Sequence, residues 1–181
     1  MSEFRKLSEE TICSGQVVSV ATATFEGPTG ERFQREVVHH PGAVAVVAVD
    51  ESAVAYLVRQ YRTAVEGYLL EVPAGKRDVR DEPPEQTARR ELQEEVGMAA
   101  GCWELLAQFH TSPGFCDELV LVYLATELTS CDPRPQGVEE SHMTVVACPL
   151  AEVSSLVESG LIKDAKTIIA LYSAKNRLGN E

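Results

Sequence analysis

The sequence lacks any apolar run long enough to cross a membrane. Its longest, 43–49, falls far short of the ~20 residues that a membrane-spanning helix needs. No apolar segment follows the charged residues at the N-terminus, so the chain does not begin like a secretory signal. We therefore expect a protein of the cytoplasm that has no membrane partner.

The sequence also has no cysteine pair at metal-binding spacing. The 5 cysteines are widely spaced, odd in number and include no CxxC pair. This pattern argues against a zinc site and suits a reducing compartment. We interpret all of them as structural thiols.

The chain has few basic residues and no long run of them. Its formal net charge of −12 would repel a polyphosphate backbone, so we expect no nucleic-acid partner. The same acidity would hinder the binding of a small anionic substrate unless a divalent cation neutralised the site. The composition alone therefore points to a metal ion.

What is present is the composition of an ordinary folded protein, with 44% hydrophobic and 24% charged residues in 181. Alternating or continuous apolar runs separated by turn residues predict strands, and helical spacing of apolar residues predicts helices. Strands are expected at 16–25, 32–38, 43–49, 53–61, 68–72, 103–110, 119–126 and 143–148, and helices at 84–96, 150–159 and 164–176. This order predicts an α/β fold, a mixed sheet between helical layers.

The first predicted helix has clear end signals. Asp81 or Glu82 can cap its N-terminus, and two prolines suit its first turn. Gly97 fits the left-handed residue that closes a helix. The preceding strand stops at Pro73-Ala74-Gly75, where a loop begins and backbone carbonyls can be exposed.

Three acids share one face of that helix. Glu91 and Glu95 are one turn apart and Glu94 lies between them, a spacing that destabilises a helix unless a cation offsets the charge. Carboxylate oxygens are the ligands that magnesium and manganese prefer. The alternative is a solvated surface in which Arg89 and Arg90 pair with the acids.

The surrounding residues resemble a known motif. The string EVPAGKRDVRDEPPEQTARRELQEEVGM is similar to the NUDIX box, G-x5-E-x7-R-E-U-x-E-E-x-G-U, where U is aliphatic. Gly75 lies one residue further upstream than the pattern asks, so Asp81 or Glu82 fills the first acidic position, and the spacing to Arg90 favours Glu82. The resemblance implies a magnesium site, with manganese as a possible substitute. Its implied ligands are Glu91 and Glu95, an additional or water-mediated Glu94, and the carbonyl of Ala74, with Arg90 orienting the carboxylates.

Further strings resemble the ADP-ribose pyrophosphatase branch of that family. Pro113 lies sixteen residues after Gly97, VRQYR precedes LEVPAG, and GLIKDAKTIIAL lies near the end. The resemblance implies a NUDIX-type α/β/α sandwich at 41–181. It also implies N-terminal strands at 1–40 that belong to the same unit and include a hairpin used in homodimerisation. The implied reaction converts ADP-ribose and water to AMP and ribose 5-phosphate.

Substrate-binding and catalytic residues follow from the same resemblance. The base that activates water would be Glu139 or Glu140, in a loop after the box. Guanidinium groups match phosphate oxygens, and the arginine candidates are Arg62, Arg35 and Arg59. The other residues expected near the substrate are Glu71, Ser112, Pro113 and Phe115. The four histidines show no ligand spacing and are assigned no chemistry.

Three alternatives remain. The same chemistry could act on another nucleoside diphosphate sugar or on NADH. A binding module could sense ADP-ribose without cutting it, although pure binding does not require Glu91, Glu94 and Glu95 together. The third is a structural protein with an acidic helix.

Overall fold

The computed structural model of the chain describes residues 3–132 and 140–179, which form two compact units. The first unit holds the chain up to Gly42 together with His110–Leu119, and the second holds Ala43–Phe109 and the chain from Val120 onward. The expected division of the chain after residue 40 stays a prediction. The inclusion of 110–119 in the first unit was not foreseen, because it depends on contacts distant in sequence.

The first unit is built on a three-stranded antiparallel sheet. Its strands are β1 (Arg5–Ser14), β2 (Ser19–Glu26) and β3 (Arg32–His39), in that order. The predicted hairpin corresponds to β2 and β3. The sequence did not reveal β1, because its residues are nearly all exposed and show no alternation of burial. Segment 110–119 joins this sheet at Val38, whose N–H donates to the Phe115 carbonyl at 2.7 Å.

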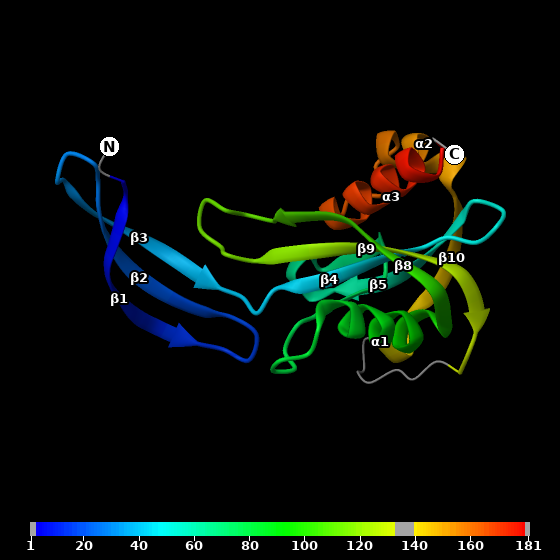
Figure 1. Ribbon diagram of the computed structural model, residues 1–181, viewed down its shortest axis with the longest axis horizontal. Helices are drawn as coiled ribbons and strands as arrows, with labels where there is room; N and C mark the ends of the chain where they lie inside the picture. The colour runs from blue at the N-terminus through cyan, green and yellow to red at the C-terminus, as the bar shows by residue number, and fades with distance from the viewer. Residues whose placement is uncertain (1–2, 133–139, 180–181) are drawn as a thin grey trace. The chain divides into compact units, whose positions relative to one another are not determined.

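Two sheets form the second unit (Figure 1). One has the order β7-β4-β9-β8, with β4 parallel to β9 and antiparallel to β7, so it is a mixed sheet as expected. The other has the order β10-β5-β6 and is antiparallel. The strand bounds are β4 Ala43–Ala48, β5 Val54–Arg62, β6 Gly67–Glu71, β7 Ala74–Lys76, β8 Met98–His110, β9 Leu119–Ser130 and β10 Thr144–Pro149.

Three α-helices complete this unit, α1 (Pro84–Val96), α2 (Val153–Glu158) and α3 (Ala165–Leu178), with 3-10 turns at Thr63–Val65, Glu140–His142 and Leu150–Glu152. Helices α1 and α3 lie on opposite sides of the sheet that contains β4 (Figure 1). The α/β/α layering expected from the sequence is therefore confirmed.

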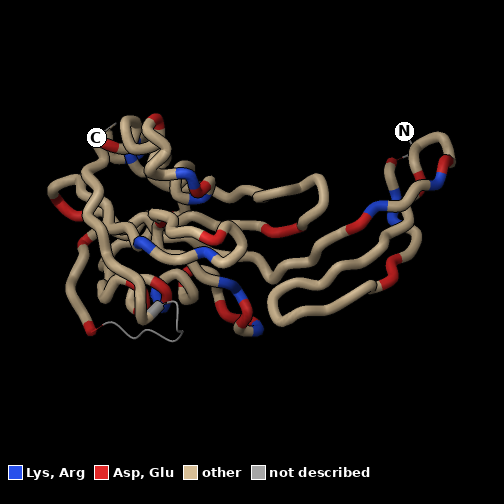
Figure 2. Tube along the Cα trace, turned by 180° about the vertical axis from the view of Figure 1, so that it is seen from behind, with Lys and Arg blue, Asp and Glu red and all other residues tan. Residues whose placement is uncertain are grey.

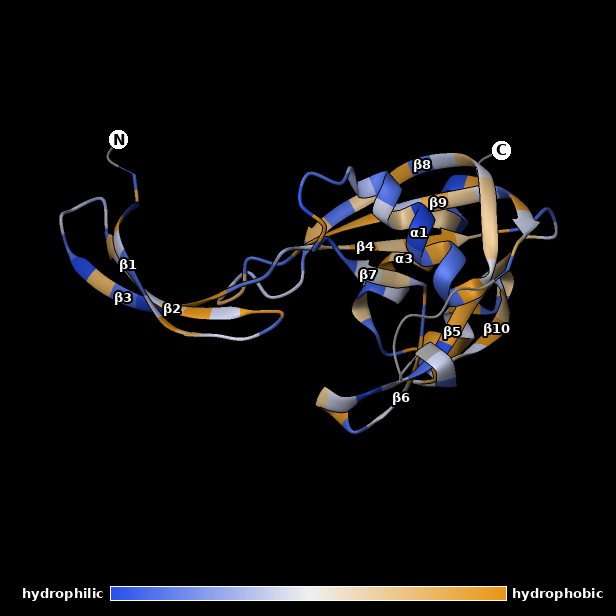
Figure 3. Cartoon of the chain, turned by 90° about the horizontal axis from the view of Figure 1, so that it is seen from below, coloured by the Kyte–Doolittle hydropathy of each residue, from blue (hydrophilic) through white to orange (hydrophobic). Residues whose placement is uncertain are grey.

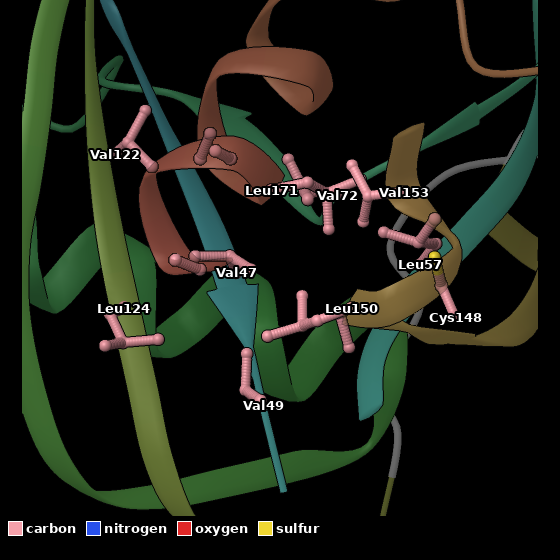
Figure 4. Packing of buried hydrophobic residues seen from close by; sticks show 14 of the residues in the cluster. Val47, Val49, Leu57, Val72, Val122, Leu124, Cys148, Leu150, Val153 and Leu171 are labelled. Atoms are coloured by element: carbon pink, nitrogen blue, oxygen red, sulfur yellow. The ribbon is translucent and has the colours of Figure 1, made fainter. Parts of the chain in front are cut away.

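Strand β4 is buried on both faces, which explains its continuous apolar sequence. Successive side chains of a strand point to opposite faces. Val47 belongs to the core cluster that includes Leu171 of α3, and Figure 4 shows both. Val46 belongs to the cluster that includes Leu92 of α1. The hydropathy colouring in Figure 3 shows β4 and β5 as mostly apolar ribbons between more polar elements.

The ends of α1 differ in part from expectation. The prediction that Asp81 or Glu82 caps the helix is wrong, because Pro83 occupies the N-cap position without a side-chain cap. The Glu82 carboxylate instead accepts a hydrogen bond from the Thr87 hydroxyl at 2.7 Å. Gly97 has a φ of 70° and ends the helix, as predicted.

None of the helices in the described parts of the chain is long and apolar enough to cross a membrane. Lysine and arginine positions are interspersed with aspartate and glutamate along the described trace (Figure 2). The five cysteines are all free thiols.

Candidate active site

The turn before α1 brings the backbone against the helix. Ala74 pairs with Ala45 in the β4–β7 ladder, and the next residue, Gly75, faces the side chain of Glu91. A Cβ atom at position 75 would overlap the Glu91 carboxylate. Glycine therefore allows a close approach of the backbone to this carboxylate, which a larger residue would displace.

Arg90 holds two of the helix acids in place. Glu91 and Glu94 are buried, with only 7% and 8% of their surfaces exposed. Nη1 of Arg90 lies 2.9 Å from a carboxylate oxygen of each. Burial alone would lower the pKa of the Arg90 guanidinium, but the charges of Glu91, Glu94 and Glu82 outweigh it and raise the pKa. Arg90 therefore orients the carboxylates.

Asp81 and Glu82, the two candidates for the first acidic position of the box, differ in exposure and in partner. The Asp81 side chain is 92% exposed and pairs with its neighbour Arg80 at 3.7 Å. The Glu82 side chain is 16% exposed and lies 3.7 Å from Nη2 of Arg90. Glu82, rather than Asp81, is thus the acid that faces the helix.

Glu95 connects the helix to the turn from the other side. Its Oε2 accepts a hydrogen bond from the Ala74 N–H at 3.1 Å. The negative charge of Glu95 also contributes to the raised pKa of Arg62, for which a hydrogen bond to Glu71 is the largest cause. Glu95 is therefore bonded to the turn and also acts electrostatically on Arg62.

The donors around this turn suit a hard divalent cation. The predicted ligands are carboxylate oxygens of Glu91, Glu94 and Glu95 and the carbonyl of Ala74, a set without nitrogen or sulfur. Within 3–132 and 140–179, however, no three His, Cys, Asp or Glu side chains already stand as a group that could hold an ion. Arg90 occupies the space between two of the carboxylates. A cation would therefore have to compete with Arg90 for them.

Arg62 is held by a buried carboxylate. Its Nε and Nη2 each donate to one oxygen of Glu71 at 2.7 Å. Glu71 has a side-chain exposure of 1% and also receives Lys166. Burial would raise the pKa of the Glu71 carboxyl, but hydrogen bonds and charge from Arg62 and Lys166 lower it. Glu71 thus lies beneath Arg62 and not on the surface.

Arg59 is not brought together with Arg62. The two residues are three apart on β5, so their side chains leave opposite faces of the strand. The Arg59 guanidinium instead lies over the Tyr68 ring, 3.8 Å from its centroid. The two predicted phosphate-binding arginines of β5 therefore do not form one cluster.

Three other predicted substrate residues, Arg35, Pro113 and Phe115, line a pocket of about 500 Å3 within the first unit. The Arg35 guanidinium lies 4.8 Å from the centroid of the Phe33 ring, which also lines the pocket. Ser112 is not a lining residue, but its carbonyl accepts hydrogen bonds from the backbone of the segment, including Phe115 N–H at 3.1 Å. The remaining lining residues are Phe4, Phe25, Glu36, Val37, His110, Gly114, Cys116 and Asp117.

The two candidate bases are not placed by the structure. Glu139 lies outside the described residues. Glu140 begins the 3-10 turn Glu140–His142, and its backbone is described but its side chain is not. Both residues remain sequence-based predictions.

Sequence reasoning missed Lys166 and Asp164. The helix-capping pattern Asp164-x-x-Thr167 was a usable signal for the start of α3. It gives no indication that Lys166 reaches a carboxylate 95 residues earlier in the chain. Such a contact follows only from the packing of α3 against β6.

Comparison with known proteins shows the family of the chain. The NUDIX domain family matches residues 38–171. The chain is 40% identical over 169 residues to an ADP-ribose pyrophosphatase of Bacillus subtilis (strain 168), covering 93% of this chain and 91% of the relative. It is 42% identical over 171 residues to an ADP-ribose pyrophosphatase of Mycobacterium tuberculosis (strain ATCC 25618 / H37Rv), covering 94% and 83%.

A solved structure shows the same fold. The crystal structure of an ADP compounds hydrolase superposes with a TM-score of 0.86 at 24% identity, and the match covers 99% of this chain and 96% of that one. The family match extends over strands β4 to β10, the turn, the glutamate-bearing helix and the first half of α3. On these grounds the chain belongs to the NUDIX family.

Proposed function

We propose that the protein hydrolyses the pyrophosphate bond of ADP-ribose, giving AMP and ribose 5-phosphate. The observation that carries the proposal is the buried carboxylate face of α1, held against a glycine turn by Arg90. Folding alone gives no reason to gather these acids. The two ADP-ribose pyrophosphatases at 40% and 42% identity support this substrate.

A divalent ion, Mg2+ with Mn2+ as a possible substitute, would be held by Glu91, Glu94, Glu95 and the Ala74 carbonyl. When bound, it supplies positive charge that stabilises the charge developing on phosphate oxygens. Arg90 keeps two of these carboxylates in position and would release them in part to the ion.

The chain's own residues perform the remaining tasks. Arg62 presents a guanidinium, with a side chain that is 40% exposed, to the phosphate oxygens of the substrate. Glu139 or Glu140 accepts a proton from the attacking water. Water then adds to one phosphorus atom, and the bond to the bridging oxygen breaks. The two products each carry a terminal phosphate.

The pocket of the first unit, which contains the predicted substrate residues Arg35, Pro113 and Phe115, suits a flat ring. Its lining joins three phenylalanines with Pro113, Phe115 and the guanidinium of Arg35. Flat aromatic and guanidinium surfaces stack well on a base. Replacing Arg35 by Ala should raise KM for ADP-ribose more than it changes kcat, as measured by steady-state kinetics.

A test of the whole proposal is the Glu95→Gln variant. It should lose most of its turnover of ADP-ribose with Mg2+ while its melting temperature stays near that of the wild type. Glu85→Gln is the matched control, because Glu85 lies on the same helix but is 47% exposed and pairs with Arg89. A Glu95→Gln variant with the wild-type rate would show that the metal assignment is wrong.

A panel of nucleoside diphosphate derivatives identifies the substrate. ADP-ribose, GDP-sugars, UDP-sugars and NADH are each assayed for phosphate-ester products with and without Mg2+. Preference for ADP-ribose supports the proposal, and preference for another compound replaces the substrate. Binding of ADP-ribose without product would identify a sensor instead of an enzyme.

We also propose a homodimer that acts in the cytoplasm. The first unit exposes apolar side chains that a second copy could cover, including Phe4, Ile12 and Val17. Five free thiols suit a reducing compartment. Light scattering should give twice the chain mass, and replacing Ile12 by Glu should shift it toward one chain.

A further inference from the structure

Glu71 lies between two cations at the junction of β6 and α3. Its carboxylate takes two hydrogen bonds from Arg62, and Lys166 of α3 contacts the Oε2 atom. The Glu71 side chain is 1% exposed and that of Lys166 is 16% exposed. Lys166 is thus a second cation on this buried carboxylate, in addition to Arg62.

Lys166 is itself held by the first turn of α3. Asp164, the N-cap residue, accepts hydrogen bonds from the Thr167 N–H at 2.9 Å and the Thr167 hydroxyl at 2.6 Å. Its other oxygen lies 3.0 Å from Lys166 Nζ. The Thr167 hydroxyl also accepts from the Val72 N–H at 2.9 Å, next to Glu71. The start of α3 is therefore fastened to the end of β6 at the buried carboxylate.

Arg62 depends on this arrangement for its direction. Glu71 of β6 pairs with Val58 of β5, four residues before Arg62 on the same strand. The Arg62 side chain therefore runs back along the sheet to reach the Glu71 carboxylate. The bonds to Glu71 use Nε and Nη2, which leaves the Nη1 edge for a ligand oxygen. Two parallel hydrogen bonds fix the plane of the Arg62 guanidinium, so its remaining edge keeps one orientation.

We propose that Lys166 and Glu71 are positioning residues that set the orientation of Arg62 toward the diphosphate of the substrate. The inference rests on the proposed function, in which Arg62 holds phosphate oxygens. Neither residue touches the substrate itself. Lys166 and Arg62 share the single negative charge of Glu71, and this leaves more of the Arg62 charge for the ligand. The C-terminal helix thereby contributes to substrate binding.

The test compares Lys166→Met with Lys163→Met. Methionine removes the charge and keeps most of the side-chain volume. Lys163 precedes the same helix but is exposed, with no ion pair among the described residues, so it is the matched control. We expect KM for ADP-ribose to rise about tenfold in Lys166→Met, because Arg62 loses its fixed orientation, with a much smaller change in kcat. Lys163→Met should behave like the wild type.

Two further measurements exclude a purely structural effect. Lys166→Arg should restore KM to within about threefold, because it returns a cation to Glu71. Titration calorimetry of ADP-ribose in EDTA should show weaker binding by Lys166→Met, without any contribution from catalysis. A variant that had only lost stability would instead contain fewer active molecules. Its apparent kcat would fall while KM and the affinity for ADP-ribose stayed unchanged. That result would overturn the proposal.

The outcomes separate the two proposals. A wild-type protein that binds ADP-ribose without cutting it would overturn the proposed hydrolysis, and weaker binding by Lys166→Met would still support the positioning role. An active wild type together with an unchanged KM in Lys166→Met would overturn the positioning role alone. If the methionine variant fails to fold, Lys166→Gln is measured in its place with the same expected rise in KM.

Discussion

The carboxylate of Glu91 occupies the position that a methyl group would take on Gly75. The substitution Gly75→Ala should therefore displace Glu91 from the turn. We expect Mg2+-dependent hydrolysis to fall at least about tenfold, because small displacements of a reacting group cost that much or more. The melting temperature should change by only a few degrees, since the site lies at the edge of the core.

Gly67→Ala is the control for that variant. A Cβ at position 67 would make only an ordinary contact with the Val65 carbonyl, at 3.6 Å. Its activity should equal that of the wild type. Equal activity in Gly75→Ala and Gly67→Ala would mean that the position of Glu91 is not important for the reaction.

Leu92 lies on α1 beside the acids but serves packing. It is fully buried in the cluster that contains Val46 of β4 and Ala88 of the same helix. Leu92→Ala should lower the free energy of unfolding by about 3 kcal/mol in urea titration. Leu161→Ala, at a position 65% exposed, should cost less than about 0.5 kcal/mol. Equal costs would contradict the placement of α1 on the sheet.

The fold and the helix of the site were predictable because both follow local rules. Strand β4 is a continuous apolar run, and Gly97 closes α1 as its sequence position indicated. The spacing of Glu91, Glu94 and Glu95 alone predicts that they share one helix face. These features need only the period of a helix or strand and the residue that ends it.

Contacts between distant segments could not be predicted in this way. The pairing of Lys166 with Glu71 depends on where α3 packs. The alternation of β5 separates Arg59 from Arg62, although both had been expected at phosphates. Strand β1 was missed because an exposed strand leaves no apolar alternation. Residue types identified the candidates, and tertiary packing decided which of them share a site.

Thr167 provides a test of the junction that is independent of charge. It is fully buried and its hydroxyl bonds both the Val72 N–H and Asp164. Thr167→Val should lower the free energy of unfolding by about 2 kcal/mol, because a buried N–H loses its acceptor. Ser155→Ala removes an exposed hydroxyl that donates to the Glu152 carbonyl and should cost less than about 0.5 kcal/mol. Chemical denaturation measures both.

The first unit contains an ion-paired histidine whose effect on stability depends on pH. Nδ1 of His39 lies 2.5 Å from Asp117 and Nε2 lies 3.0 Å from Glu9. Carboxylates only accept hydrogen bonds, so both contacts are complete when both ring nitrogens carry protons. The hydrogen bond to Asp117 is the largest cause of the raised pKa of His39, and the pKa values of Glu9 and Asp117 are lowered.

The sign of the pH dependence follows from these directions. Because the folded pKa of His39 is raised, its contribution to stability is full below the unfolded value of about 6.5 and is lost as pH rises through the folded pKa. The carboxylates behave oppositely, since their contribution is lost as pH falls through their lowered pKa values. The free-energy difference between the wild type and His39→Gln should therefore be largest between about pH 5 and 6.5 and smaller at pH 8.5. Urea titration at these pH values measures it, with His110→Gln as the control because His110 hydrogen-bonds a backbone carbonyl and pairs with no acid in the described parts of the chain. A difference that stays constant or grows toward pH 8.5 would show that His39 is not protonated between the two acids.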